Sequence, residues 1–564
     1  MHPLTSAMTT LKTSLLAALK SFLRGRSFLQ ALLAFWVNPK TMKEQHVDGK
    51  GMYPSRTIGE FLKEAEKLLL GPIGGDGLRR YSSELKYQFR ERLHTHAECM
   101  LPSFNHLLPT GKERGQYLAL DVGGSTLRVA LVELRGREAT GRESEIIRMD
   151  SFKITPEIKK LEGMSFFDWM ATRIYEVIHK DTSPGQEIIP LGLAWSFPVE
   201  QVSLSGGLLL GMGKGFLATN GLLGQDLGEI IKFACKKQGL NVQLAAIVND
   251  SSATLLSQAY VHASTRFGLI LGTGTNIAVH LSVSSFSRSK YGTRPESWFD
   301  SASHVIVNTE LGMFGKDILP LTRWDELLNA DHPRPDFQPL EHLLSGYYLG
   351  EICRLAIVEA VETAGLLGGQ LPPSLEKPYS LDTEILSRIE ADTSPTLETA
   401  LEHFTKHHPS PVPPTVSDII AIRTLATFIS RRSAALLAAS VFSLWDLRHE
   451  TESEHAKLTP TPTLSNDSAV VLPETDAEIE ELEAAQAATP ESTKVAFNGS
   501  VIEHYPRFRT TCQQYINDLV GGSEHPGSVD LVPALESSIL GAAVALACAT
   551  AEQKIVKESA PVKV

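Results

Sequence analysis

The chain has 564 residues, more than one hydrophobic core usually serves, so we expect two domains. Its apolar fraction of 42% and charged fraction of 21% are typical of a soluble globular protein. A formal net charge of −12 argues against a nucleic-acid-binding protein, which would carry a basic face. The five cysteines are odd in number, widely spaced and without a CxxC pair. This excludes a zinc ribbon and a secreted disulfide framework, and indicates a reducing, cytoplasmic compartment.

The N-terminal segment departs from this balance, since residues 1–43 contain six Lys or Arg and no Asp or Glu. Two apolar clusters, SLLAAL and FLQALLAFW, are separated by Arg24-Gly25-Arg26. Neither reaches the about 20 apolar residues that a membrane-spanning helix needs. Such a segment is typical of a helix on a membrane surface or of mitochondrial targeting, and the alternatives are a disordered tail or a helix packed on its own domain.

Two amphipathic helices are predicted next, within residues 51–114. TIGEFLKEAEKLLL and RRYSSELKYQFRERLH both place apolar residues three and four apart, and the glycine-rich GPIGGDG separates them.

A β-hairpin is predicted from Tyr117 to Leu134, because YLALDVGGSTLRVALVEL places two runs of β-type residues around a glycine turn. Gly123 and Gly124 permit positive φ and let backbone N–H groups face outward, a geometry that holds phosphate oxygens. Asp121 ends the first strand, beside that turn, where the magnesium ion of a nucleotide needs carboxylate or water ligands. Turns favour these residue types in any case, so one hairpin is weak evidence.

The same pattern recurs in FGLILGTGTNIAVHLSV, from Phe267 to Val283. Here the turn is Gly272-Thr273-Gly274-Thr275, followed by Asn276. Two similar hairpins, each at the start of an α/β segment, predict a duplicated fold in which two backbone turns hold the phosphates of one ATP.

Two segments between the hairpins carry further polar candidates. LGLAWSFPVEQ reads as a strand that stops at Pro198 and leaves Ser196 on a loop. In GKGFLATN, Lys214 lies between two glycines, so its ammonium group can reach a ligand with little obstruction. Taken alone, Lys214 is better explained as a solvated loop charge.

AAIVNDSSA, from Ala245 to Ala253, reads as the end of a buried strand followed by adjacent polar side chains. Ligands of open α/β sheets bind where strands end in this way, which makes Asn249 and Asp250 candidate site residues. The alternative is that these residues only cap the helix that follows.

Taken in chain order, these motifs carry a family resemblance. LALDVGGSTLR, SFPVEQ, GKGF, IVNDSSATL, GLILGTGTN, NTELGMFG, LEHLLSGYYLGEICR, NGSVIEHYPRFR and LVPALESSILGAAVALA resemble the motif series of eukaryotic hexokinases and glucokinases, over roughly Tyr53 to Ala549. The resemblance implies transfer of the γ-phosphoryl group of Mg-ATP to the 6-hydroxyl of a hexose, glucose above all. It also implies an α/β, actin-like ATPase fold (a duplicated ribonuclease H-like fold) with two unequal domains around a deep cleft.

The resemblance also implies a role for individual residues. Asp250 matches the catalytic base, which accepts the hydroxyl proton, and Lys214 the lysine beside it. The positions that match sugar-binding residues are Ser196, Lys214, Asn249, Asp250, Asn276, Glu310 and Glu341. The positions that match nucleotide-binding residues are Asp121, Gly123, Gly124, Ser125, Thr126, Arg128, Gly272, Thr273, Gly274, Gly499 and Ser500, with Asp121 acting on magnesium indirectly, through the ATP-bound ion.

The domain boundaries follow from the same resemblance. The expected division is a tail at 1–50, N-terminal helices of the large domain at 51–114, a small domain at 115–249, a large domain at 250–535, a C-terminal helix returning to the small domain at 536–556, and a tail at 557–564. Within the large domain, residues 450–494 are rich in Thr, Pro, Ser, Glu and Ala, and we expect a disordered acidic surface insertion. It is a candidate site for phosphorylation or for a regulatory protein partner, and the alternative is a surface loop without a specific role.

Several positions depart from the family pattern. Gly213 stands where a Thr is usual before the lysine, Asn220 replaces an acid, and Ser125-Thr126 replaces Thr-Asn. Glu536-Ser537-Ser538-Ile539 replaces Asp-Gly-Ser-Gly, and we expect the β-branched Ile539 to tolerate positive φ poorly and to crowd the adenosine side. These departures resemble the divergent hexokinase-like proteins of filamentous fungi. They leave open a catalytically weakened, sugar-sensing regulator as the alternative to an active enzyme. A sugar kinase of another branch or a chaperone-type ATPase is a third possibility.

Overall fold

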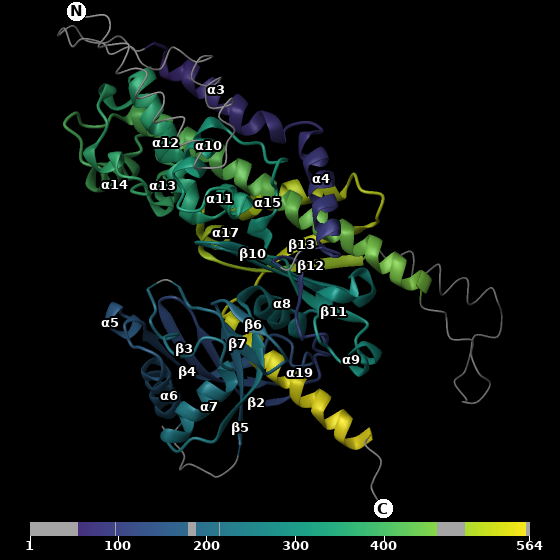
Figure 1. Cartoon of the computed structure of the whole chain (residues 1–564). Helices are drawn as coiled ribbons and strands as arrows, with labels where there is room; N and C mark the ends of the chain where they lie inside the picture. Colours follow the sequence, from purple (N-terminus) through teal and green to yellow (C-terminus); the bar gives the residue numbers. More distant parts are fainter. Residues whose placement is uncertain (1–54, 96–97, 179–187, 214, 459–490, 560–564) are drawn as a thin grey trace, which may run out of the picture. The chain divides into compact units, whose positions relative to one another are not determined.

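A five-stranded mixed sheet forms the smaller lobe of the protein (Figure 1). Its strands, in spatial order, are β4 (Ser144–Lys153), β3 (Thr126–Leu134), β2 (Gly115–Val122), β5 (Ile189–Trp195) and β8 (Val242–Val248). β2 and β3 form the predicted antiparallel hairpin, while β5 and β8 continue the sheet in parallel with β2.

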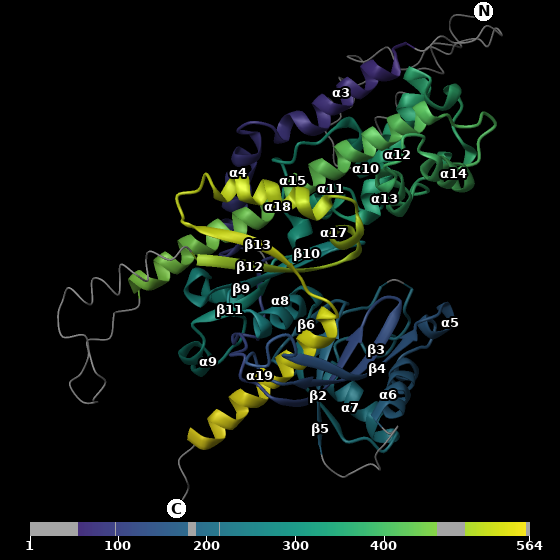
Figure 2. The ribbon, with the colours of Figure 1, turned by 180° about the vertical axis from the view of Figure 1, so that it is seen from behind.

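Helices cover both faces of this sheet. One face packs against α6 (Met164–Ile178) and α7 (Leu227–Lys237), where Phe166, Phe167 and Ile231 are fully buried. The other face is covered by the predicted C-terminal helix, α19 (Ser537–Ser559), which also contacts α8 (Asp250–Val261) and is seen from behind in Figure 2. The shorter elements of this lobe are α5 (Pro156–Lys159), β6 (Val199–Gln201) and β7 (Gly207–Leu209).

A six-stranded sheet forms the larger lobe. Its strands, in spatial order, are β1 (Leu101–Pro102), β11 (His304–Asn308), β10 (Thr275–Ser282), β9 (Thr265–Leu271), β12 (Glu491–Asn498) and β13 (Gly527–Pro533). β9 and β10 form the second predicted hairpin, β11 extends it in antiparallel, and β12 and β13 extend it in parallel on the other side. The succession β4-β3-β2-β5-β8 in the first sheet has this same connectivity. The fold is therefore duplicated, as the two glycine hairpins predict.

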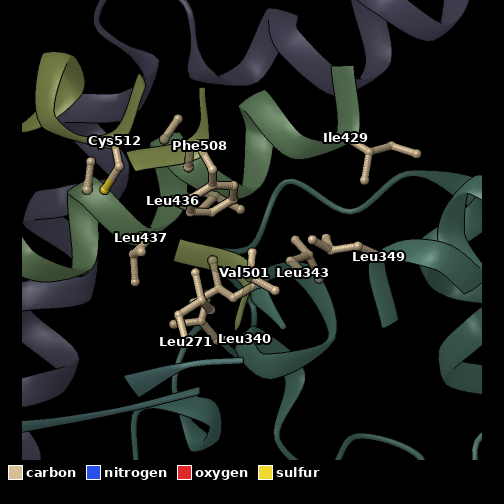
Figure 3. Packing of buried hydrophobic residues seen from close by; sticks show 14 of the residues in the cluster. Leu271, Leu340, Leu343, Leu349, Ile429, Leu436, Leu437, Val501, Phe508 and Cys512 are labelled. Carbon is tan, nitrogen blue, oxygen red and sulfur yellow. The ribbon is translucent and has the colours of Figure 1, made fainter. Parts of the chain in front are cut away.

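Helices of the larger lobe surround one long buried helix, α15 (Val416–Leu458) (Figure 1). Figure 3 shows part of this core, in which Leu436 and Leu437 of α15 lie near Phe508 and Cys512. The other helices are α3 (Ile58–Leu70), α4 (Gly77–Arg92), α9 (Glu296–Ser301), α10 (Arg323–Asp331), α11 (Pro339–Leu344), α12 (Gly346–Ala364), α13 (Thr383–Ala391), α14 (Glu398–His407), α17 (Ser500–His504) and α18 (Phe508–Val520), and the 3₁₀ turns are η2 (Gly71–Ile73), η3 (Val283–Ser285), η4 (Arg288–Tyr291), η5 (Leu311–Met313), η6 (Leu366–Gly369) and η7 (Pro373–Glu376).

Local sequence explains why the predicted N-terminal helices begin and end where they do. Thr57 and Glu60 form a reciprocal capping box at the start of α3, and η2 and a glycine turn separate α3 from α4. Among the described helices, α15 alone is long and apolar enough to cross a membrane, but 83% of its most apolar window is buried inside the protein. It is therefore a core helix.

The computed structural model describes residues 55–95, 98–178, 188–213, 215–458 and 491–559. The basic N-terminal segment and Lys214 lie outside this part of the chain. The expected insertion is narrower than predicted, because α15 continues to Leu458 and β12 begins at Glu491. Its helical start is held by ion pairs, since Glu450 binds both Lys86 and Arg90 of α4. Residues 459–490 are not described.

Close backbone approach fixes α19 between the first sheet and α8. A Cβ on Gly192 of β5 would overlap the carbonyl of Ala542, and a Cβ on Gly541 would overlap the backbone of Ala253. Only glycine permits these contacts, so helix α19 lies directly against the helix that begins at Asp250.

Candidate active site

Three neighbouring parallel strands of the smaller lobe end at one edge of the sheet and place polar residues there. Asp121 is the penultimate residue of β2 and pairs in register with Ala194 of β5. Ser196 follows β5 directly, and its N–H donates to the carbonyl of Val122 at 3.2 Å. Asn249 follows β8 in the same way. The carboxyl ends of these strands therefore bring together candidates that are far apart in the sequence, as expected for a ligand site of an α/β sheet.

Asn249 and Asp250 lie next to each other at the start of α8. Asn249 is the N-cap of α8, and its Oδ1 accepts from the backbone N–H of Ser252 at 2.9 Å. Asp250 is the first residue of the helix, and its Oδ1 accepts from the N–H of Ser251 at 2.7 Å. The positive end of the helix dipole favours the ionised form of a carboxyl group at this position. Asn249 supplies the N-cap, and Asp250 accepts from the next N–H group of the same helix start, so both side chains take part in it.

The second glycine turn, after β9, is packed against two helix starts. The N–H of Gly272 donates to the carbonyl of Gly274 at 3.0 Å, and its own carbonyl accepts from Gly346 at the start of α12. A Cβ on Gly272 would lie 3.4 Å from the backbone N of Ser500, at the start of α17. Gly499 has a φ of +130°, and a Cβ there would overlap the carbonyl of Leu271. The structure thus joins Gly272, Thr273 and Gly274 to Gly499 and Ser500, which the sequence places more than two hundred residues apart.

The candidate sugar-binding residues of the larger lobe form a hydrogen-bonded chain. The side-chain amide of Asn276 donates to Oδ1 of Asn308 at 2.8 Å, and Nδ2 of Asn308 donates to Oε1 of Glu310 at 2.7 Å. Oδ1 of Asn276 in turn accepts from the N–H groups of Ile277 and Leu311. Asn308 was not among the predicted site residues. The polar end of a buried strand just before Thr309-Glu310 was the available signal for it.

Glu310 is held in an unusual environment. Its backbone lies in the left-handed region with a φ of +52°, a conformation that non-glycine residues adopt at a cost of about 1–3 kcal/mol. Burial raises the pKa of its carboxyl group, the hydrogen bond from Asn308 opposes this, and the negative charge of Asp250 raises it further. The charge of Asp250 therefore adds to the effect of burial on the Glu310 carboxyl group.

Glu341 lies beside the second glycine turn. Its Oε2 accepts from the N–H of Thr275 at 3.4 Å, and a Cβ on Gly274 would lie 3.5 Å from its carboxylate oxygens. The Glu341 carboxylate therefore packs against the turn at Gly274.

The first glycine turn is tight but does not use the conformation expected for it. The N–H of Gly123 donates to the carbonyl of Thr126 at 3.0 Å, yet Gly123 is not in the positive-φ region. Gly123 therefore does not use the positive φ that glycine permits. The carbonyl of Ser125 accepts from Ile154, which attaches the turn to the end of β4.

Arg128 links the first hairpin to the start of α19. It pairs across the hairpin with Asp121, whose Oδ2 lies 3.0 Å from Nε and 2.6 Å from Nη2. Its Nη1 donates to Oε2 of Glu536 at 2.7 Å. Burial raises the pKa of Asp121, Arg128 lowers it, and the charges of Asp250 and Glu536 raise it again. Arg128, a predicted nucleotide-binding residue, is thus already engaged by two carboxylates.

The expectation that Ile539 crowds the adenosine side was wrong. Ile539 is fully buried among the apolar side chains between α19, α8 and the first sheet, and it is helical. The residue with positive φ in this segment is Glu536, at +48°. The phase of α19 turns Ile539 toward the core, whereas Glu536, which precedes the helix, binds Arg128.

Lys214 lies outside the described residues, so the structure does not describe its side chain. Both neighbours have positive φ, with Gly213 at +60° and Gly215 at +81°. A β-branched residue would be strained at Gly213, which gives a backbone reason for glycine where the family has Thr.

The arrangement is one of carboxylates and amides from two lobes, beside two glycine turns. Oriented acceptors of this kind recognise the hydroxyl groups of a polyol, and backbone turns with a nearby arginine suit phosphates. The site and the duplicated fold together define the class as an ATP-dependent phosphotransferase that acts on a sugar.

Comparison with known proteins identifies the family. Two family models described as hexokinase match residues 73–260 and 266–548. Hexokinase-5 of Oryza sativa subsp. japonica is 29% identical over 512 residues, which cover 88% of this chain and 91% of that protein. Hexokinase-1 of Saccharomyces cerevisiae is 29% identical over 454 residues, which cover 79% and 83%. A solved structure of the hexokinase from Schistosoma mansoni, complexed with glucose, has a TM-score of 0.67 at 25% identity and covers 87% of this chain and all of that chain.

The chain therefore belongs to the hexokinase family and is a hexokinase-type phosphotransferase with the actin-like ATPase fold. The predicted family and fold class are confirmed, and a sugar kinase of another branch is excluded. The roles of individual site residues remain predictions.

Proposed function

We propose that the protein transfers the γ-phosphoryl group of Mg-ATP to the 6-hydroxyl of glucose, at the entry to glycolysis. The observation that carries the proposal is the position of Asp250. It lies at a helix N-terminus, and its negative charge raises the pKa both of Asp121, beside the first glycine turn, and of Glu310, in the hydrogen-bonded chain of the larger lobe. A carboxylate between a phosphate turn and a sugar-binding network is where a general base for this reaction belongs.

In this mechanism, Asp250 accepts the proton of the 6-hydroxyl group while the oxygen of that hydroxyl group attacks the γ-phosphorus atom of ATP. The network of Asn276, Asn308 and Glu310, together with Glu341, holds the other hydroxyl groups and fixes the direction of attack. By family resemblance, Lys214 supplies a positive charge beside the transferred phosphoryl group.

Magnesium fits the site only as a companion of the nucleotide. Among the described residues, no group of three or more His, Cys, Asp or Glu could hold a metal ion. Mg²⁺ commonly keeps several waters and binds through phosphates and one or two carboxylates. Asp121, at the first glycine turn, is the carboxylate that would face it through water. The ion would offset charge on the phosphates.

The weakened, sugar-sensing regulator loses its main support, because Ile539 lies in the core rather than beside the nucleotide. What remains is the absence of a hydroxyl group at Gly213. A lost neutral hydrogen bond is worth about 0.5–1.5 kcal/mol, which weakens sugar binding without abolishing it.

A coupled assay for glucose 6-phosphate tests the proposal on wild type and on Asp250→Asn and Asp250→Ala. We expect wild-type turnover, and a loss of kcat of at least about 100-fold in both variants. Asp226→Asn is a matched control, because Asp226 also lies at a helix start, where it caps α7 outside the site. Wild-type turnover no higher than that of Asp250→Ala would refute the proposal.

For location, we propose a cytoplasmic enzyme whose residues 1–43 hold it at the mitochondrial surface. The support is their six basic residues, their lack of acidic ones and their two apolar clusters. Deleting residues 1–43 should move the protein from the mitochondrial to the soluble fraction. An unchanged distribution would contradict the proposal.

A further inference from the structure

Glu536, the residue before α19, carries a carboxylate that no part of the proposed chemistry uses. Glu536 binds the same guanidinium as Asp121, and the two acids together engage Nε, Nη1 and Nη2 of Arg128. Asp121 and Arg128 face each other within one hairpin, whereas Glu536 comes from the other end of the chain. The single positive charge of Arg128 is thus shared by two carboxylates, of which the one within the hairpin is enough to orient it.

The backbone of Glu536 shows that this position is imposed by its surroundings. Its φ of +48° is unfavourable for a residue with a side chain, and such a conformation persists where neighbouring contacts fix it. Those contacts are present on both sides. Ala534 donates to the carbonyl of Phe497 in β12 at 2.9 Å, and the hydroxyl group of Ser537 lies 2.9 Å from that of Thr254 in α8.

Thr254 lies one turn after Asp250, so the same contact ties Glu536 to the helix that carries the proposed base. The close approach of Gly541 to Ala253, one α19 turn further on, makes this attachment rigid. Glu536 therefore cannot move away from Arg128 by a shift of the helix, and it must leave by rotation of its own side chain. Its side chain is 42% exposed, which leaves room for that rotation.

Rotation of the Glu536 side chain would change the charge that a phosphate meets at the first glycine turn. Asp121 is nearly buried, with 8% of its side chain exposed, and Arg128 is 30% exposed. Arg128 is the cation beside a turn that we expect to receive phosphate oxygens. While Glu536 is bound, a polyphosphate meets an additional negative charge and an arginine whose Nη1 is occupied.

We propose that Glu536 is a positioning residue that sets nucleotide affinity, by occupying the face of Arg128 that phosphate oxygens take over when the nucleotide binds. This inference rests on the proposed function for the identity of the nucleotide. Glu536 and the phosphate are alternatives on one guanidinium, so removing the carboxylate strengthens nucleotide binding and leaves sugar binding unchanged.

Calorimetric titration of the full chain with Mg-ADP and with glucose tests this on wild type and Glu536→Gln. We expect the Kd for Mg-ADP to fall about two- to fivefold in Glu536→Gln, the range of a partly exposed ion pair, with the glucose Kd unchanged. Added salt should narrow the difference between the two proteins. Glu138→Gln is the matched control, because it removes the 2.6 Å ion pair with Arg114 on the same lobe, away from the site. It should leave both constants unchanged.

Glu536→Gly separates charge from backbone strain, because it removes the carboxylate and also relieves the positive φ. Equal tightening in Glu536→Gln and Glu536→Gly assigns the effect to the charge. If the Kd for Mg-ADP falls only in Glu536→Gly, the proposal is overturned. It is also overturned if the Kd for Mg-ADP in Glu536→Gln is unchanged or higher, because Glu536 would then orient Arg128 for nucleotide binding rather than compete with the phosphate. A thermal melt establishes that each variant is folded.

The outcome is distinguishable from failure of the proposed function. A wild-type protein that binds Mg-ADP but gives no glucose 6-phosphate refutes the proposed function, while the Kd comparison still decides the role of Glu536. Absence of Mg-ADP binding in every variant overturns the inference.

Discussion

Asn308 provides the sharpest test of the sugar-binding network, because it joins two predicted site residues and was not itself predicted. Its amide nitrogen donates to Glu310 and its oxygen accepts from Asn276, at 2.7 and 2.8 Å. The oxygen also accepts from the backbone N–H of Glu310 at 3.3 Å. Replacing Asn308 by Ala removes all three contacts and adds none.

The size of the effect follows from the hydrogen bond to the carboxylate. A hydrogen bond to a charged group contributes about 1.5–3 kcal/mol, and a loss of that size corresponds to about a 10- to 150-fold change in an equilibrium constant. We therefore expect kcat/KM for glucose to fall by about 10- to 150-fold in Asn308→Ala. KM for ATP should change less than about threefold, because the network lies on the sugar side.

Steady-state kinetics with each substrate varied in turn gives both numbers. Asn329→Ala is the matched control, since Asn329 also exchanges two hydrogen bonds with an acid, Asp336, at 2.8 and 2.9 Å on the same lobe. It should leave kcat/KM unchanged. If Asn308→Ala keeps kcat/KM for glucose within about threefold of wild type, the network does not position Glu310 and the reasoning fails.

Three further predictions concern stability and its dependence on pH. Arg432→Met removes the ion-pair partner of the buried Asp325, which keeps only its hydrogen bonds from Thr322, and should lower the free energy of unfolding by about 3–5 kcal/mol in urea titrations; a loss below about 1 kcal/mol would contradict this. Gly541→Val should cost about 1–3 kcal/mol, seen as a lower Tm, because its Cβ overlaps the backbone of Ala253; an unchanged Tm would show that the helices separate freely. Burial lowers the pKa of His280 to about 3, so the unfolded chain binds more protons than the folded one between about pH 3 and 6.5. Stability should therefore rise with pH across that window, by at most about 1.4 kcal/mol per pH unit for this one residue, and His280→Gln should have a shallower slope; an equal slope would refute the assignment.

Much of the framework could be predicted from local pattern alone. Alternating β-type residues around glycine turns located both hairpins, and the break at Pro198 located the end of β5. The three- and four-residue spacing located α3 and α4. These features depend on residues close in sequence, where steric and hydrogen-bonding preferences act directly.

What failed depends on contacts between distant segments. Asn308 enters the site because β10 and β11 pair with Ala278 opposite Asn308, a register that no local pattern reveals. The end of α15 looked like part of a disordered insertion, yet its acidic residues find Lys86, Arg90 and His304 on other elements. Polar composition predicts disorder only where such partners are missing.

The segment from Glu536 to Ile539 shows how a departure from a family pattern changes its meaning once the helix phase is known. From the sequence alone, the bulky Ile539 was expected to crowd the adenosine side of the site and to weaken activity. In the structure, Ile539 fills the core between α19 and α8, and the positive φ belongs to Glu536 instead. Because Ile539 is buried in the core, the contact of this segment with a predicted nucleotide-binding residue is the ion pair between Glu536 and Arg128. A competing phosphate can displace a charged side chain, whereas bulk in a packed core stays in place, so we expect this departure to change nucleotide affinity rather than catalysis.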